Sequence, residues 1–314
     1  PAGFCVNAKD RNDQELIAEK YLEVGLDVIL GGGERYFSTD QRKDKVDVLG
    51  KFESKGYELI GDRNALTSSA LEKPLLGLFG DDALPYSIDQ EQNKEQNSKV
   101  PTLAEMTEVA IKKMSNNVDG FVLQVEAGKV DWAAHGNDIG ALIHDQLAFD
   151  EAINVAYAFA KDNPDTLLVV TTDHGNSNPG TIYGADASVN FDKLQNYTSS
   201  NANLLTSINF NTSVSQLQEL IMHHQKWHLN EGDAKKVLDA YKNLSEEDIS
   251  NYRKLPFRNL SELQGKENSI GWMSNDHSSD FVELLLVGPG HELLPHFIQN
   301  NELHNILLDA AGIA

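Results

Sequence analysis

Residues 121–174 read FVLQVEAGKVDWAAHGNDIGALIHDQLAFDEAINVAYAFAKDNPDTLLVVTTDH, and this stretch decides the fold. Its opening apolar run, Phe121–Val125, predicts a buried strand that ends at Glu126. The long amphipathic segment Ile139–Ala160 predicts a helix, and the β-branched run Thr166–Val170 predicts a second strand. Strands that alternate with helices of this length are typical of an α/β protein with a mostly parallel sheet.

The same alternation continues upstream of this stretch. Asp13–Val24 predicts a helix, Asp27–Leu30 a strand and Leu75–Phe79 another strand. Pro101–Met114 predicts a further helix, whereas the polar segment Asp89–Ser98 predicts a surface loop. Three consecutive glycines follow the strand at Leu30, but no phosphate-loop Lys-Ser/Thr comes after them. They therefore favour a tight backbone turn over a nucleotide-binding loop.

A different pattern occupies residues 176–270, where Asn, Ser and Gln are frequent. Gln216–Leu229 and Asp233–Leu244 predict short helices, and no strong strand is visible. We interpret this segment as an insertion outside the main sheet, which forms a crown-like structure or a lid.

The α/β pattern returns with a strand at Phe281–Val287 and a closing helix near Asn301–Ala311. No internal repeat is visible. The fold prediction is a three-layer α/β sandwich with a mostly parallel central sheet flanked by helices. Residues 1–175 and 271–314 would form it, and the less regular, helical insertion would stand apart from it.

The amino-acid composition excludes several classes of partner and site. The formal net charge of −22 argues against nucleic acid as a partner, because phosphate backbones are bound by clustered Lys and Arg. An anionic substrate would need local positive charge, which metal ions can supply. Cys5 is the only cysteine, which excludes an intrachain disulfide and a Cys-rich zinc site. No run approaches the roughly 20 apolar residues of a membrane span.

Candidate metal ligands follow the first strand of the deciding stretch. If Asp131 opens a helix, its i,i+4 spacing from His135 puts both side chains on one face, able to hold one cation. Carboxylate oxygen with imidazole nitrogen suits zinc. Glu126 stands at the strand tip, where an oxygen-only site such as Mg²⁺ can use it.

Further candidates adjoin two other strands. Asp173 and His174 directly follow the strand that ends near Thr172, and His277 precedes the strand at Phe281–Val287. Open α/β sheets place their sites at the carboxyl ends of strands, so these side chains could form two zinc sites and a harder third site. Taken singly, each motif also fits chance spacing, a helix cap or a turn residue. Their conjunction favours metal binding.

The other seven histidines fall outside these strand tips, and we interpret them as structural or solvent-facing. They are His144, His223, His224, His228, His291, His296 and His304. Among them, His223, His224 and His228 are spaced closely enough to suggest a weak surface metal site.

Gly120–His135 resembles the metal-binding signature of alkaline phosphatases, and Thr171–His174 resembles their second signature. Supporting stretches are Leu30–Gly33, Lys73–Phe79, Pro101–Met106 and Phe149–Ala152. The resemblance runs through about the first 175 residues and resumes at Trp272–Gly290, whereas the insertion matches nothing that we can place.

The resemblance implies two zinc ions and one magnesium ion. The first zinc would be held by Asp131, His135 and His277, the second by Asp173 and His174, and the magnesium by Glu126. Pro1-Ala2 looks like the tail of a Thr-Pro-Ala motif, after which Arg11 would grip two phosphate oxygens. Trp132, beside Asp131, stands where family members vary, and it would influence phosphate release.

The implied activity is hydrolysis of small phosphomonoesters through a phosphoserine intermediate, with release of inorganic phosphate. In this family the nucleophilic Ser, a shared Asp and a Thr ligand of the magnesium precede the Pro-Ala. We therefore expect that the natural protein continues upstream, and that this chain alone is inactive. The family also implies a homodimer located in the periplasm or secreted.

Two alternatives stay open. The first is a cofactor-independent phosphoglycerate mutase, because Asp173–Asn176 also resembles the motif of that enzyme. The glutamate-bearing segment Gln124–Asp131 favours the phosphatase instead. The same segment also argues against a phosphodiesterase or a sulfatase. The second alternative is a non-catalytic metal-binding protein, which kept the metal ligands and lost the nucleophile.

Overall fold

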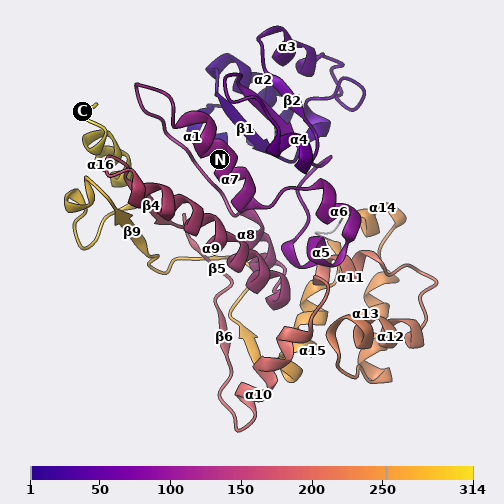
Figure 1. Ribbon diagram of the computed structural model, residues 1–314. Coiled ribbons are helices and arrows are strands. Elements are labelled where there is room, and N and C mark those ends of the chain that lie inside the picture. The colour runs from indigo at the N-terminus through magenta and orange to yellow at the C-terminus, as the bar shows by residue number, and fades with distance from the viewer. Residues whose placement is uncertain (1, 252–253, 314) are drawn as a thin grey trace. The chain divides into compact units, whose positions relative to one another are not determined.

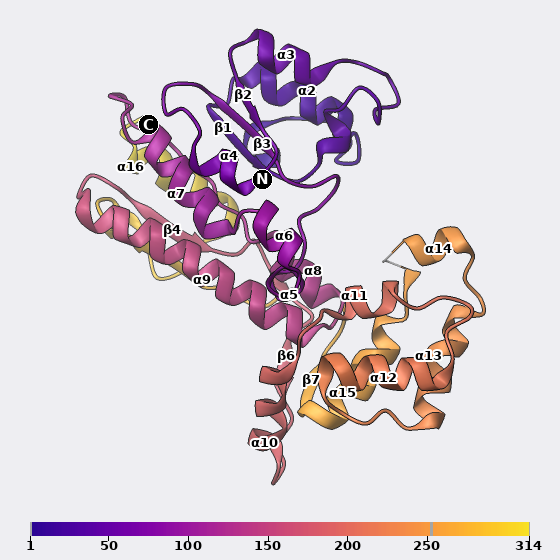
Figure 2. The same cartoon turned by 45° about the vertical axis from the view of Figure 1, so that its right-hand side comes forward.

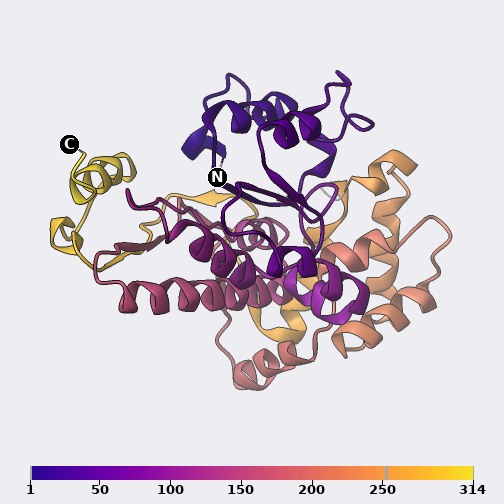
Figure 3. The same ribbon diagram turned by 45° about the horizontal axis from the view of Figure 1, so that its top comes forward.

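The structure is a computed structural model that describes residues 2–251 and 254–313, and it divides into two compact units. Unit 1 comprises Pro1–Pro85, Asn93–Ala127 and Ala148–Ala156. Unit 2 comprises Tyr86–Gln92, Gly128–Leu147 and Tyr157–Ala314. Helix α9 (Ile139–Asp162) contributes residues to both units and is one unbroken helix, as Figure 3 shows.

Unit 1 is built around a small parallel sheet. Its elements are α1 (Ala2–Cys5), α2 (Gln14–Val24), β1 (Val28–Gly31), η1 (Glu34–Tyr36), α3 (Val48–Ser54), β2 (Glu58–Ile60), α4 (Arg63–Thr67), β3 (Leu75–Leu78), α6 (Lys94–Lys99) and α7 (Leu103–Met114). The strand order is β1-β3-β2, with β3 parallel to both neighbours. Figure 1 shows β1 and β2 with the helices of this unit. Leu75 stands opposite Val28 on one side and Glu58 on the other.

The two faces of this sheet are covered by different helices. Leu76 of β3 packs in one buried cluster with Phe52 of α3 and residues of α2. Leu75, one position earlier, points to the other face and packs with Leu66 of α4 and Met106 of α7. Helices on both faces of a parallel sheet make three layers, which confirms the predicted α/β class.

Local signals explain the helices that the sequence predicted correctly. Asp13 caps α2 by accepting a hydrogen bond from the Leu16 amide at 3.3 Å. Thr102 opens α7 with a capping box, in which its hydroxyl and the Glu105 carboxylate each accept a bond from the other residue's amide. The strands predicted at Asp27–Leu30 and Leu75–Phe79 are β1 and β3.

The loop predicted for Asp89–Ser98 is wrong. This region forms two short helices, α5 (Ser87–Gln92) and α6, and Asn93 caps the second of them. Polar composition concealed them, because a single fully buried side chain, Ile88, ties α5 to the core.

The buried strand predicted at Phe121–Val125 is also wrong. The segment is extended, but no strand among residues 2–251 and 254–313 pairs with it, and Val122 is 79% exposed. Half-buried and exposed residues alternate along it, as expected of extended backbone. An extended segment becomes a strand only when a neighbour supplies the ladder of hydrogen bonds.

Unit 2 combines many helices with short antiparallel strand pairs. Its elements, besides α5 and part of α9, are α8 (Gly128–His135), β4 (Leu168–Thr171), β5 (Gly175–Asn176), β6 (Pro179–Thr181), α10 (Ala187–Asp192), η2 (Lys193–Asn196), α11 (Asn201–Thr206), α12 (Val214–Gln225), α13 (Glu231–Tyr241), α14 (Glu246–Ser250), α15 (Phe257–Asn268), β7 (Ile270–Trp272), β8 (His277–Ser278), β9 (Leu284–Val287), η4 (His291–Leu293), η5 (Asn300–Glu302) and α16 (Leu303–Ala310). The antiparallel pairs are β4 with β9, β5 with β8, and β6 with β7.

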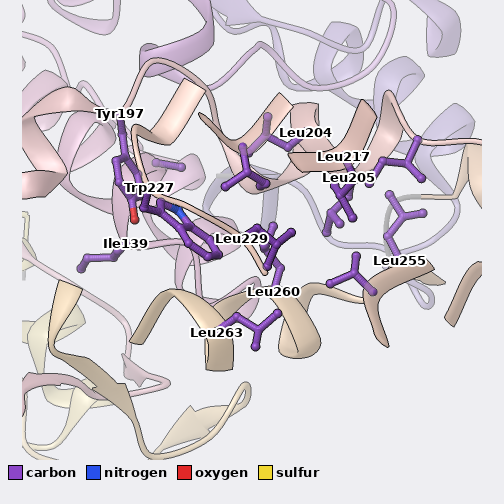
Figure 4. Packing of buried hydrophobic residues seen from close by; sticks show 14 of the residues in the cluster. Ile139, Tyr197, Leu204, Leu205, Leu217, Trp227, Leu229, Leu255, Leu260 and Leu263 are labelled. Carbon is purple, nitrogen blue, oxygen red and sulfur yellow. The ribbon is translucent and has the colours of Figure 1, made fainter. Parts of the chain in front are cut away.

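The largest buried cluster of the described residues lies in unit 2, where α11, α12, α13 and α15 gather, as Figure 2 shows. Figure 4 shows Leu204, Leu217 and Leu260 meeting there from three of these helices. Ile139, at the start of α9, belongs to the same cluster. Helices α12 and α13 confirm the two predicted for residues 176–270, whereas the role of this segment as a crown or lid stays a prediction.

The remaining predicted strands and the closing helix are present, together with four short strands that the sequence did not predict. The strands expected at Thr166–Val170 and Phe281–Val287 are β4 and β9, which pair antiparallel, and α16 is the closing helix. The sequence did not predict β5, β6, β7 and β8, which are two or three residues long. No helix among the described residues has the length and apolar character needed to cross a bilayer.

Candidate metal centre

Helix α8 presents two candidate ligands from one face. Ala133 and Ala134 are buried and anchor the helix, whereas Asp131 and His135 are each more than a third exposed. The i,i+4 spacing brings His135 Nε2 to 3.6 Å from Asp131 Oδ2. The prediction that both side chains share one face of a helix is confirmed.

The short ladder between β5 and β8 adds two histidines. Asn176 pairs with His277 across the ladder, and His174 directly precedes β5. The rings of His174 and His277 stack with their centroids 3.6 Å apart. His277 Nε2 lies 4.0 Å from Asp131 Oδ1 and 3.2 Å from His135 Nε2.

These side chains form a group able to hold a metal ion. Asp131, His174 and His277 each offer one ligand atom, and the three atoms lie within 4.8 Å of one another. His135 adjoins the group through His277. Asp173 adjoins it through a 3.2 Å contact of its carboxylate with His174 Nε2, although Asp173 is 78% exposed.

The hydrogen bonds of the imidazoles suit a divalent cation. His135 Nδ1 lies 2.7 Å from the carbonyl oxygen of Asn275, so Nδ1–H donates to that carbonyl and Nε2 is the nitrogen that faces Asp131 and His277. His174 Nδ1 stands 3.3 Å from the Gly175 carbonyl, and its Nε2 faces the Asp173 carboxylate at 3.2 Å. A carbonyl that accepts from the second ring nitrogen is the usual support of a metal-bound histidine. The donor set of imidazole nitrogen and carboxylate oxygen fits zinc.

The comparison with known proteins adds to this geometry. The family model described as alkaline phosphatase matches residues 3–313. The chain belongs to the alkaline phosphatase family. Membership confirms the resemblance seen in the sequence and gives no support to the mutase alternative.

Two solved alkaline phosphatases share the fold. The enzyme of Thermus thermophilus superposes with a TM-score of 0.89 at 34% identity, covering 100% of this chain and 68% of that chain. The cold-active enzyme of a psychrophilic Shewanella sp. superposes with a TM-score of 0.80 at 25% identity, covering 100% of this chain and 72% of that one.

A curated relative shows how much of the family's length is present. Alkaline phosphatase 3 of Bacillus subtilis (strain 168) is 29% identical over 311 residues, which are 96% of this chain. The chain spans 63% of the length of that relative.

Two contacts of this candidate site in the alkaline phosphatase family member were not predicted. The Asn176 amide donates to Asp131 Oδ1 at 2.7 Å, and the Asn275 carbonyl holds His135. The signal for Asn176 was present, because alternate residues of an extended segment share a face, and Asn176 lies two positions after His174. Nothing in the sequence marks a backbone carbonyl.

The roles of three other predicted site residues are not tested by the geometry of this group. Glu126 and Arg11 are exposed residues of unit 1, and their roles stay predictions. Pro1, predicted to end the Thr-Pro-Ala motif, lies outside the described residues. Trp132 of α8 packs against the core of unit 2, and the Lys129 ammonium stands 4.4 Å from the centre of its ring.

The histidines outside these strand tips make other contacts. His144 stands 3.3 Å from Glu91, and His224 Nδ1 stands 3.2 Å from the Thr198 hydroxyl. The rings of His223 and His224 meet edge to face. Within the part of the chain that the structure describes, no group of three possible ligands includes them or His228.

Buried carboxyl groups support the helix that follows α8. Asp138 caps α9, where it accepts bonds from the amides of Ala141 at 3.1 Å and Asn201 at 2.5 Å. Burial raises the pKa of Asp138 to about 7 and the pKa of Asp145 to about 6. Burial also raises the pKa of Asp89, against hydrogen bonds that lower it.

Proposed function

We propose that this chain is the metal-binding part of a metal-dependent phosphomonoesterase. The observation that carries the proposal is the convergence of Asp131, His174 and His277, with His135 beside them, in a chain of the alkaline phosphatase family. The net charge of −22 repels an anionic phosphate ester, so a cation at this group would provide the local attraction that the chain lacks. Bound divalent cations would supply Lewis-acid stabilisation of the phosphoryl oxygens.

The finer assignment follows the family resemblance. Asp131, His135 and His277 would hold one zinc ion, Asp173 and His174 a second, and Glu126 a magnesium ion. The N/O donor set supports zinc for the histidine-bearing group, and the lone carboxylate supports magnesium. The closeness of His174 to His277 supports two adjacent cation positions.

The substrate would be held and attacked by protein groups. Arg11 would hold two phosphate oxygens with its planar guanidinium, and the nucleophilic Ser would come from the part of the family's length that this chain does not span. The Ser would form a phosphoserine that water then hydrolyses. Small phosphomonoesters as substrates, a homodimer and a periplasmic or secreted location are parts of the same proposal, supported by family membership.

Trp132 would affect phosphate release because it directly follows Asp131 on α8. Trp132→Lys, which adds a charge beside the group, should change the inhibition constant of inorganic phosphate. An unchanged constant would remove this role.

The proposal is tested by hydrolysis of an aryl phosphate by the protein that carries this chain at the family's full length. His277→Ala should lower kcat/KM by at least a hundredfold and reduce the zinc content, because it removes a ligand at the centre of the group. His291→Ala is the matched control, because His291 Nδ1 bonds the Gly288 carbonyl outside the group. Hydrolysis by His277→Ala at the control's rate would refute the proposal.

A further inference from the structure

We infer that Asn176 and Ser177 are positioning residues, which hold Asp131, His135 and His277 in the arrangement that binds a cation. The inference rests on the proposed metal-dependent function and deepens it. The Asn176 amide nitrogen faces Asp131 and its oxygen accepts from Ser177, so each residue would act through the candidate ligands.

Asn176 fixes the only carboxylate of the three-residue group. Its amide nitrogen donates to Asp131 Oδ1 at 2.7 Å and to the Asp131 carbonyl at 3.2 Å. One side chain therefore holds both the carboxylate and the backbone of α8 at the same residue. Because Oδ1 accepts this bond, the plane of the carboxylate is set before a cation arrives.

Ser177 fixes the orientation of that amide. Its hydroxyl donates to Asn176 Oδ1 at 2.8 Å, which leaves Asn176 Nδ2 facing Asp131. Ser177 is fully buried, so water does not compete for this bond. A chain of two hydrogen bonds therefore links the buried Ser177 hydroxyl, through the Asn176 side-chain amide, to the Asp131 carboxylate.

The backbone of Ser177 also organises the turn that carries His277. Its amide donates to the Asp276 carbonyl at 2.9 Å, and its carbonyl accepts from the Met273 amide at 3.0 Å. The Asn275 carbonyl of the same turn accepts from His135 Nδ1. Ser177 is therefore bonded to Asn176, which holds Asp131, and to Asp276, which directly precedes His277.

The conformation of this segment is costly for its residue types. Ser177 and Asn178 both adopt the left-handed region, with φ of 57° and 42°. Backbone strain of this kind persists where surrounding contacts impose it, and it gathers at functional sites. Here the contacts that impose it are those with the turn and with Asn176.

The test uses the 314-residue chain and Zn²⁺ alone, with affinity measured by competition against a chromophoric chelator. Asn176→Ala removes the donor to Asp131, and Ser177→Ala removes the hydroxyl while keeping the backbone bonds. Asn178→Ala is the matched control, since it lies on the same strained segment and its amide bonds Asp280 instead. Thermal unfolding of the metal-free proteins measures any purely structural effect.

We expect Asn176→Ala to weaken Zn²⁺ binding about 10–100-fold, Ser177→Ala by an intermediate factor, and the control by less than about threefold. Equal Zn²⁺ affinity in Asn176→Ala and the wild type would overturn the inference and leave the proposed function intact. A lowered metal-free melting temperature with unchanged affinity would overturn it too, because that is a structural role. A wild-type chain that binds no Zn²⁺ would overturn both.

Discussion

Replacement of Asp138 by Ala should destabilise the protein in a way that depends on pH. The Asp138 side chain is 98% buried, being 2% exposed, and it accepts bonds from two amides. Loss of an N-cap costs about 1 kcal/mol. The Asn201 amide would be left buried without its partner, which costs about 1–3 kcal/mol. At low pH the variant should therefore be about 2–4 kcal/mol less stable than the wild type.

The sign of the pH dependence follows from the raised pKa. Burial, followed by the facing carboxylates of Asp89 and Asp145, raises the pKa of Asp138 to about 7, against an unfolded value of about 3.9. The folded wild type therefore keeps a proton that the unfolded chain releases, and the stability from the protonated group is lost as pH rises from about 4 to 7. The variant lacks this carboxyl group, so its stability does not change in this way. The difference in unfolding free energy between the wild type and Asp138→Ala (the stability gap) should therefore fall by about 1.4 kcal/mol per pH unit between about pH 4 and 7.

Urea unfolding followed by circular dichroism at pH 5, 6, 7 and 8 measures this gap. Between pH 5 and 8 the wild type should lose about 3 kcal/mol of stability relative to the variant, which cancels or reverses the difference, with most of the change below pH 7. Asp62→Ala is the reference for loss of an exposed cap, since Asp62 accepts a 2.9 Å bond from the Ala65 amide at the start of α4. A gap for Asp138→Ala that stays constant or widens with pH would refute the reasoning.

Two further substitutions test the cores of the units separately. Arg42 is fully buried and bonds Glu19, Asp44 and two backbone carbonyls, so Arg42→Ala should cost about 3–5 kcal/mol by leaving these partners unpaired; a loss under about 1 kcal/mol in urea unfolding would contradict this. Ile221 is fully buried in the core of unit 2, so Ile221→Ala should cost about 2–5 kcal/mol, and an unchanged melting temperature would show that the site is not packed as described.

The sequence predicted most of the long elements because their signals are local. The helix at Asp13–Val24 carries its own cap, and α9 carries an amphipathic pattern over many turns. The prediction of a strand at Phe121–Val125 failed because a strand depends on a non-local partner. A run of apolar residues becomes a buried strand only when a partner strand is present. The pattern cannot report whether that partner is present.

In the candidate site, too, the contacts within one helix could be predicted from the sequence more easily than the contacts between distant segments. The i,i+4 relation of Asp131 and His135 is a property of one helix, and it was predictable. The approach of His277 to His174 depends on a ladder of two residue pairs between segments about a hundred positions apart. Two-residue strands are too short to show any periodicity, so the meeting of these histidines was indicated by their places beside strand ends and by the family resemblance, not by a local pattern.

The helix α5 illustrates a third case. Two of its residues bond remote partners: the Ser87 hydroxyl donates to Asp145, and the Asp89 carboxylate accepts from the Ser200 hydroxyl. These contacts and the burial of Ile88 stabilise a helix whose polar sequence predicts a loop. Tertiary contacts here override local composition.

Anomalous diffraction at the zinc absorption edge, from crystals of the chain grown with Zn²⁺, tests the central claim most directly. We predict a peak about 2.0–2.2 Å from His277 Nε2 and from a carboxylate oxygen of Asp131. A zinc-loaded crystal without density between these side chains, or with its zinc at His223 and His224 instead, would contradict the account.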